Sequence, residues 1–191
     1  MSFPVGQFFG EGGYVDSSAL YPADFGTLAV TPGATYALPF IVHRASDLQS
    51  ARVRVSSGAA GTVKGALYAV YPNVAGAEYP AYPGYPSSLI AESNVERDTS
   101  EPGNKILNFG LGVSLDPGLY YLAVQFSAAP TVVSIQATAS GLYAGHPVSR
   151  YSGVYDPNTT YGTFVDPFNN DNWGLYDNPM PYVFVTLVVR D

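Results

Sequence analysis

The chain contains no cysteine, so it can form neither a disulfide framework nor a thiolate site, and thiol chemistry is excluded. Charged residues make up only 12% of its 191 residues, against roughly 25% in an average soluble domain. Hydrophobic residues nevertheless reach 47% and aromatic residues 14%, which excludes a disordered chain or a coiled coil. A single domain of this length can bury a sizeable core and does not need disulfides or bound metal ions for its stability.

Basic residues are also scarce. Eight lysines and arginines stand against fifteen acidic residues, which gives a net charge of −7, and the basic residues are scattered along the chain. We therefore expect neither nucleic acid nor an anionic membrane as a partner. The first ten residues carry no basic stretch, and no window approaches about 18 consecutive apolar residues. We expect neither a secretory signal nor a membrane span.

Long runs with a helical period are missing, whereas 20 glycines, 16 prolines and 16 tyrosines favour short strands joined by turns. The sequence therefore predicts an all-β fold with at most one short helix. Strands are expected at Thr35–His43, Leu48–Ser56, Thr62–Tyr71, Lys105–Phe109, Gly118–Phe126, Thr131–Thr138 and Tyr182–Val189.

Two of these strands carry more detailed predictions. Arg52 and Arg54 alternate with Val53 and Val55, which places two guanidinium groups on one face of a half-buried strand and two valines on the other. A solvated outer face explains the arginines better than a partner contact does. The last strand, Tyr182–Val189, is nearly all apolar, as in a strand covered on both sides or in a subunit contact. We expect it to close the sheet beside an early strand.

Three stretches lack this strand rhythm. Residues 1–34 are rich in glycine and predict an extended N-terminal arm, with the sandwich domain at 35–191. Residues 72–86 interleave prolines with tyrosines and predict an exposed extended loop. Residues 141–181 hold several Asx-Pro pairs and predict a long irregular insertion, and insertions of that length are usually functional.

Five motifs between Tyr36 and Ala137 follow one another in an order and spacing that resembles a known module. They are Ala37–Val42 (ALPFIV), Leu48–Val55, Val63–Ala69 (VKGALYA), Tyr85–Ile90 (YPSSLI) and Leu115–Ala123 (LDPGLYYLA). The last combines a tight turn at Asp116-Pro117-Gly118 with an alternating strand. Together they resemble a β-sandwich module of the tail, fibre and other virion proteins of tailed bacteriophages and gene transfer agents.

The resemblance implies an antiparallel β-sandwich, of jelly-roll or carbohydrate-binding-module type, with long irregular loops. It covers a little over half of the chain. The sequence departs from the family pattern at Tyr121, where tryptophan is common, and in the 72–86 insertion. Fold alone does not give function, so the resemblance speaks to virion context more than to a site.

No catalytic constellation is visible. The only histidines, His43 and His146, lie at a strand end and before a proline, where a structural or solvated role is expected. Nucleophile elbows, phosphate-binding loops and dinucleotide fingerprints are absent. We therefore expect a protein that is not an enzyme and uses no cofactor, although a carboxylate pair for glycan hydrolysis stays open because spacing in space is unknown.

Hard oxygen ligands crowd the stretch 166–177. They are Asp166, Asn169, Asn170, Asp171, Asn172 and Asp177. The spacing fits no EF-hand, and Asx residues in such loops more often cap their own turns. We expect no metal here.

Aromatic residues gather in the predicted loops. They are Tyr79, Tyr82, Tyr85, Tyr151, Tyr155, Tyr161, Trp173 and Tyr176. Tyrosine offers a large, rigid contact area at low entropic cost, so these rings are candidates for binding a glycan or a protein partner.

The sequence thus predicts a non-enzymatic structural protein on the exterior of a phage-like virion, assembled in the bacterial cytoplasm. Capsid decoration or a head spike is the first interpretation. The alternative is a tail-fibre or tail-tip module that binds host surface polysaccharide through its tyrosine loops. Expected partners are other capsid or tail proteins, further copies of the chain in a homo-oligomer such as a trimer, and a host surface glycan.

Overall fold

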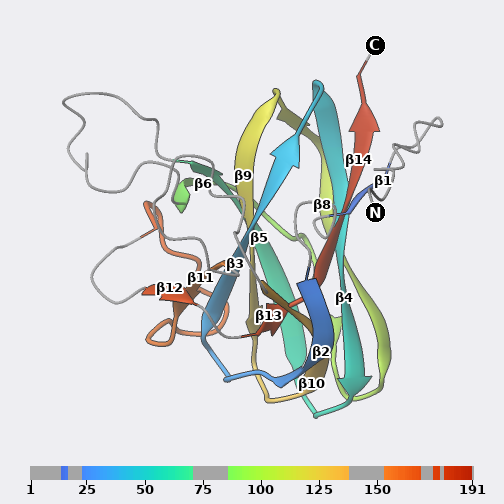
Figure 1. The fold of residues 1–191 in the computed structure, drawn as a ribbon, viewed down its shortest axis with the longest axis vertical. Coiled ribbons are helices and arrows are strands. Elements are labelled where there is room, and N and C mark those ends of the chain that lie inside the picture. The colour runs from blue at the N-terminus through green and yellow to red at the C-terminus, as the bar shows by residue number, and fades with distance from the viewer. Residues whose placement is uncertain are drawn as a thin grey trace.

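The computed structural model describes residues 14–16, 23–70, 86–137, 153–168, 174–176 and 179–190. Within these ranges the chain forms fourteen strands and no helix. The strands make two antiparallel sheets, which pack against each other (Figure 1). The predicted all-β class and antiparallel β-sandwich are confirmed. No helix long and apolar enough to span a membrane occurs in these ranges.

The first sheet, called sheet A, has strands from both ends of the chain. Its strands are β1 (Tyr14–Asp16), β2 (Ala23–Ala29), β4 (Ser46–Ser57), β8 (Gly103–Leu115), β10 (Thr131–Ala137), β13 (Met180–Pro181) and β14 (Val183–Val189). β4 pairs with β8 along one edge, and with β14 followed by β10 along the other. β1 lies outside β14, and β2 lies outside β10.

The second sheet, sheet B, has the order β12-β11-β3-β9-β5-β6, with β7 also paired to β5. Its strands are β3 (Thr35–Val42), β5 (Thr62–Val70), β6 (Pro86–Glu92), β7 (Arg97–Asp98), β9 (Gly118–Phe126), β11 (Gly153–Asp156) and β12 (Gly174–Tyr176). β3, β9 and β5 form its centre in continuous register.

The predicted central strands agree with the structure, and β9 has the predicted limits. The prediction Lys105–Phe109 is too short, because β8 runs on to Leu115. The pairing of β4 with β8 is interrupted between Leu48 and Ser50, where residues 109–112 of β8 stand against a single residue of β4, and it resumes at Val113.

Both chain ends contribute strands that sequence patterns define poorly. Part of the predicted arm 1–34 lies in sheet A as β1 and β2. The last strand lies beside the early strand β1, as predicted. It is not covered on both sides, because Val183, Val185 and Leu187 are buried while the residues between them are partly exposed. The described parts of the 141–181 insertion include three short strands, β11 to β13, held by pairing to longer strands.

The main core fills the space between the sheets. Sheet B contributes alternate residues of β3, β5 and β9, among them Phe40, Leu67 and Leu122. Sheet A contributes residues such as Val53 and Leu107 from β4 and β8. These side chains are almost entirely removed from solvent, so their burial is the main stabilising contribution to the sandwich.

Replacing Leu122, which is 1% exposed in the central strand β9, tests this core. Leu122→Ala should lower the free energy of unfolding by about 2–5 kcal/mol, because it removes buried methyl groups and leaves a cavity. Ile90→Ala, at a position 41% exposed on β6, is the control and should cost about 0.5 kcal/mol or less. Denaturant unfolding measures both, and equal losses would contradict the assignment of the core.

Candidate interaction surface

The outer face of sheet B is covered by a segment of the same chain. We call residues 157–168 the strap. Phe164 and Phe168 of the strap are 7% and 2% exposed and pack with Tyr68 and Tyr121 of β5 and β9 in a second apolar cluster. The Tyr68 and Phe168 rings meet edge to face, with centroids 5.2 Å apart. The centre of sheet B is therefore buried on both of its faces, whereas β6 keeps exposed positions such as Ile90.

Gln125 of β9 fixes the strap to the sheet. Its side chain is fully buried and donates hydrogen bonds to Thr35 Oγ1 (2.8 Å) and to the Thr163 carbonyl (3.0 Å). Its Oε1 accepts from the Gly162 N–H at 2.9 Å. Gly162 has a φ of 82°, a conformation that glycine adopts without strain. A buried amide satisfied in this way holds the strap in one position.

The strap also occupies the free edge of β6. The Phe168 N–H donates to the Ser87 carbonyl (2.7 Å), and the Leu89 N–H donates to Asp166 Oδ1 (3.0 Å). The Tyr68 hydroxyl donates to the Val165 carbonyl at 2.8 Å. Asp166, proposed from sequence as part of an oxygen-rich stretch, therefore caps a sheet edge with its carboxylate.

Two of the aromatic residues singled out from sequence have described side chains, and both pack on the sandwich. Tyr155 lies in strand β11, where its ring meets that of Tyr36 with centroids 5.0 Å apart. Tyr161 lies in the strap, and its hydroxyl is 2.6 Å from Thr62 Oγ1. Partial burial raises the pKa of Tyr161 to about 12, and the nearby Glu96 carboxylate adds to the rise.

The other candidate rings lie outside this description. Tyr79, Tyr82, Tyr85, Tyr151 and Trp173 fall outside the described residues, as do His146 and positions 169–173 and 177 of the oxygen-rich stretch. Tyr176 is described only as part of strand β12. Their role in binding a glycan or a partner stays a prediction.

The outer face of sheet A carries a row of side chains with no strap from the described residues over it. The register places Phe184 of β14 opposite Arg52 of β4, and Arg52 opposite Ile106 of β8. The Arg52 guanidinium lies over the Phe184 ring at 5.1 Å from its centroid. Ile106 is 47% exposed. The predicted alternation is confirmed, since Val53 and Val55 are buried and Arg54 is exposed.

Aromatic contacts extend this row toward β2. The Phe184 ring meets that of Tyr182 with centroids 4.2 Å apart, and Tyr182 meets Phe25 of β2 at 5.1 Å. Phe25 is 62% exposed. We call these five residues, Phe25, Tyr182, Phe184, Arg52 and Ile106, the sheet A row. Tyr182 is buried and belongs to the main core, whereas the other four are partly or largely exposed. A continuous row of apolar and cationic side chains is typical of a contact surface, whereas single exposed apolar residues are not.

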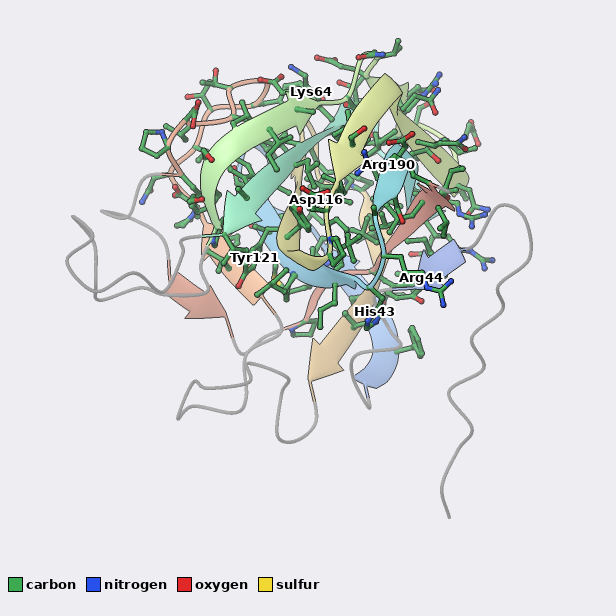
Figure 2. The ribbon with its side chains drawn as sticks, turned by 90° about the horizontal axis from the view of Figure 1, so that it is seen from above. His43, Arg44, Lys64, Asp116, Tyr121 and Arg190 are labelled. Atoms are coloured by element: carbon green, nitrogen blue, oxygen red, sulfur yellow. The ribbon has the colours of Figure 1, made fainter. Side chains whose placement is uncertain are left out.

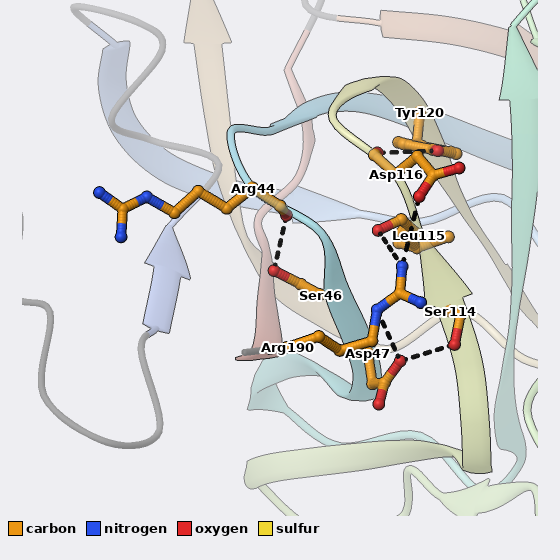
Figure 3. Close-up of polar contacts among 8 residues, drawn as sticks. All are labelled: Arg44, Ser46, Asp47, Ser114, Leu115, Asp116, Tyr120 and Arg190. Atoms are coloured by element: carbon orange, nitrogen blue, oxygen red, sulfur yellow. Dashed lines mark hydrogen bonds and ion pairs between the residues drawn. The ribbon is translucent and has the colours of Figure 1, made fainter.

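A polar cluster closes the end of the sandwich where the chain terminates (Figure 2). Arg190, just after β14, forms ion pairs with Asp47 and Asp116 and donates to the Leu115 carbonyl (Figure 3). Asp47 also accepts from Ser114 Oγ at 2.7 Å. The Arg44 side chain points away from Arg190 (Figure 3). These contacts tie the end of the last strand to the start of β4 and to the turn between β8 and β9, and the cluster serves the fold.

Sequence reasoning overlooked some of the residues that define both faces. Gln125 carried a usable signal, because it is the one amide in the otherwise apolar and aromatic strand Gly118–Phe126. The sheet A row was predicted only in part. Alternation placed Arg52 on an outer face, and the strand Tyr182–Val189 was predicted, but Phe25 and Ile106 carried no signal because they join the row only through tertiary contacts and strand register. His43 is exposed at the turn after β3. In the described ranges, no group of three histidines or carboxylates is placed to hold a metal.

No protein family model matches the chain, and no curated protein is significantly similar to it. The class that the structure establishes is the antiparallel β-sandwich. The resemblance to phage virion proteins stays a prediction from the sequence.

Replacing Gln125 tests the attachment of the strap. Gln125→Leu keeps the approximate size but leaves the Gly162 N–H and the Thr163 carbonyl without their partner, at a cost of about 1–3 kcal/mol for each buried unsatisfied group. Amide exchange at residues 157–168 should accelerate while exchange in β4 and β8 changes little. Gln49→Leu, at an exposed position on β4, is the control. Unchanged exchange in the strap of Gln125→Leu would refute this role.

Tyr161 of the strap and Tyr68 beneath it predict a loss of stability in alkali. An unfolded tyrosine releases its proton near pH 10, whereas folded Tyr161 holds it until about pH 12. Burial also raises the pKa of Tyr68. The folded state therefore binds more protons, and the free energy of unfolding should fall as pH rises above 10. Tyr161→Phe should reduce this slope in unfolding measured from pH 9 to pH 12. A slope equal to that of the wild type would contradict the account.

Proposed function

We propose that this chain is a non-enzymatic structural protein on the exterior of a phage-like particle, a capsid decoration or head-spike protein. In this proposal it attaches to its neighbours through the outer face of sheet A. The observation that carries the attachment is the sheet A row, with Phe25 and Ile106 exposed at its two ends. The sequence resemblance between residues 36 and 137 supports the virion context.

The contrast between the two sheets supports this choice of face. On sheet B, Gln125 and the strap aromatics bury the outer surface within the chain itself. On sheet A, the described residues leave Arg52 stacked on Phe184 with Ile106 beside it. An arginine on an aromatic ring next to an apolar side chain suits a protein contact, in which arginine and aromatic residues contribute most of the binding energy.

The charge of the chain favours a selective contact of this kind. At a net charge of −7, copies repel one another over most of their surface. Arg52 and Arg54 lie on the same outer face of β4 and give it a local positive character. The neighbour that this face fits is an acidic protein surface with an apolar centre.

A substitution at the row tests the attachment. Ile106→Asp should lower the incorporation of the chain into particles by about tenfold or more, the effect of losing about 1.4 kcal/mol of binding. Ile90→Asp is a matched control, since Ile90 is 41% exposed but lies on β6 of sheet B, and its incorporation should match the wild type. Equal incorporation of both variants would refute attachment through sheet A.

Immunogold labelling of purified particles tests the location. Gold spread regularly over the head is the expected result and would support decoration or a head spike. Gold confined to the tail tip or fibres would contradict the proposed location and favour the receptor-binding alternative. Particles without label would contradict a virion role altogether.

A further inference from the structure

In the described chain, hydrogen bonds from other segments cap two long sheet edges. On β8, the Ile106 carbonyl accepts from Arg97 Nε at 2.7 Å, and the Asn108 carbonyl accepts from the Asn94 N–H at 2.8 Å. On β6, the strap takes up the outward groups of Ser87 and Leu89. Hydrogen bonds that occupy the outward backbone groups in this way prevent another strand from pairing with the edge.

Other edges are covered by additional strands. β14 carries β1 over Phe184–Thr186, and β3 carries β11 over Thr35–Ala37. The rest of β3 contains Pro39, a residue type that disfavours pairing at an edge. These two edges are therefore closed to a further strand over part of their length.

β2 has no such protection from the described residues at any point along its length. It pairs with β10 over all seven of its residues, Ala23–Ala29, and its backbone makes no other hydrogen bond to the described part of the chain. It contains no proline or lysine, the residues that commonly blunt an edge. Phe25, Gly26 and Thr27 in its middle are exposed. Among the described residues, nothing pairs with the outward donors and acceptors of this seven-residue strand.

We propose that this edge binds the β2 strand of a second copy of the chain, antiparallel and around a two-fold axis at Gly26. In such a pair, residues at equal distances on either side of the axis lie opposite each other, on the same side of the sheet. The position of the axis therefore decides how many residues of the strand are paired. Centring on Gly26, the middle residue, pairs all seven residues, with Ala23 opposite Ala29 of the second copy. Any other centre leaves residues of the strand unpaired.

The side chains fit this register. It places Phe25 opposite Thr27 of the second copy, an aromatic and β-branched pair of the kind that stabilises antiparallel strands. It places Asp24, the only charged residue of the strand, opposite Leu28. Two carboxylates therefore do not face each other directly, which matters for a chain of net charge −7. A nearly uncharged strand is where two such chains meet with least repulsion.

The pairing is independent of the proposed virion role, since it concerns the chain with itself in solution. It joins the A sheets of two copies into one sheet and adds ladder hydrogen bonds on both sides of the axis. Because two-fold pairing is closed, it yields a dimer and not a filament.

The absence of cysteine makes a direct test possible. Neighbouring Cα atoms in an antiparallel pair lie about 4.5–5.5 Å apart, within the span of about 4.4–6.8 Å that a disulfide bridges. A Cβ at Gly26 would lie 3.5 Å from Ser134 Oγ, an ordinary contact, so Gly26→Cys fits the fold. With a mild added oxidant, Gly26→Cys should form a covalent dimer much faster than Ile90→Cys, which lies on the capped edge of β6.

Sedimentation of the cysteine-free chain gives the second measurement. The wild type should show a mass of twice 20.3 kDa, and Phe25→Lys and Thr27→Lys should each shift it to that of one chain. Ile90→Lys should retain the dimer. Thermal unfolding of each variant shows whether the fold is kept, and the two lysine variants guard against a change at one position that merely unfolds β2.

Three results would overturn the proposal. A wild-type chain that sediments as a monomer excludes the pairing, and protected β2 amides in that monomer would show that another segment of the same chain occupies the edge. A dimer that survives both lysine variants is held by another surface. Cross-linking of Gly26→Cys no faster than that of Ile90→Cys excludes the two-fold axis at Gly26. None of these results bears on incorporation into particles.

Discussion

Gln125 makes the hydrogen bonds on which the covering of sheet B by the strap depends. It is fully buried in the central strand of sheet B and binds the strap at Gly162 and Thr163. Once the strap is held there, Phe164 and Phe168 bury the outer face of sheet B within the chain. The outer face of sheet B is then committed to the fold. In the described part of the chain, sheet A keeps exposed apolar side chains on its outer face and backbone groups without a partner along β2.

Similar side chains therefore have different roles on the two sheets. Aromatic rings on sheet B pack against the strap, where burial raises the pKa of Tyr68. On sheet A, aromatic rings form part of the sheet A row, whose two ends, Phe25 and Ile106, are both substantially exposed. An arginine stacked on Phe184 keeps its charge at the surface while its stem covers apolar area. This asymmetry is the physical basis for assigning attachment to sheet A.

Much of the fold could be predicted from the sequence, because alternation and turn chemistry act locally. Gly118–Phe126 has the predicted limits, and the turn at Asp116-Pro117 joins β8 to β9 as expected. The short strands β11 to β13 could not be predicted, since pairing to longer strands holds them and not their own pattern. Even less of the candidate site could be predicted from the sequence. Tyr155 and Tyr161 were chosen as surface aromatics, but their contacts with Tyr36 and Thr62 arise only through tertiary packing.

Hydroxyl-radical footprinting of the chain, free and in assembled particles, tests the central claim that sheet A is the attachment side. Reactivity at Phe25 and Ile106 should fall on assembly, because a neighbour would cover their exposed side chains. Reactivity at Ile90, exposed on β6 of sheet B, should stay the same. Protection at Ile90 with Phe25 and Ile106 unchanged would contradict the account and place the contact on the opposite side of the sandwich.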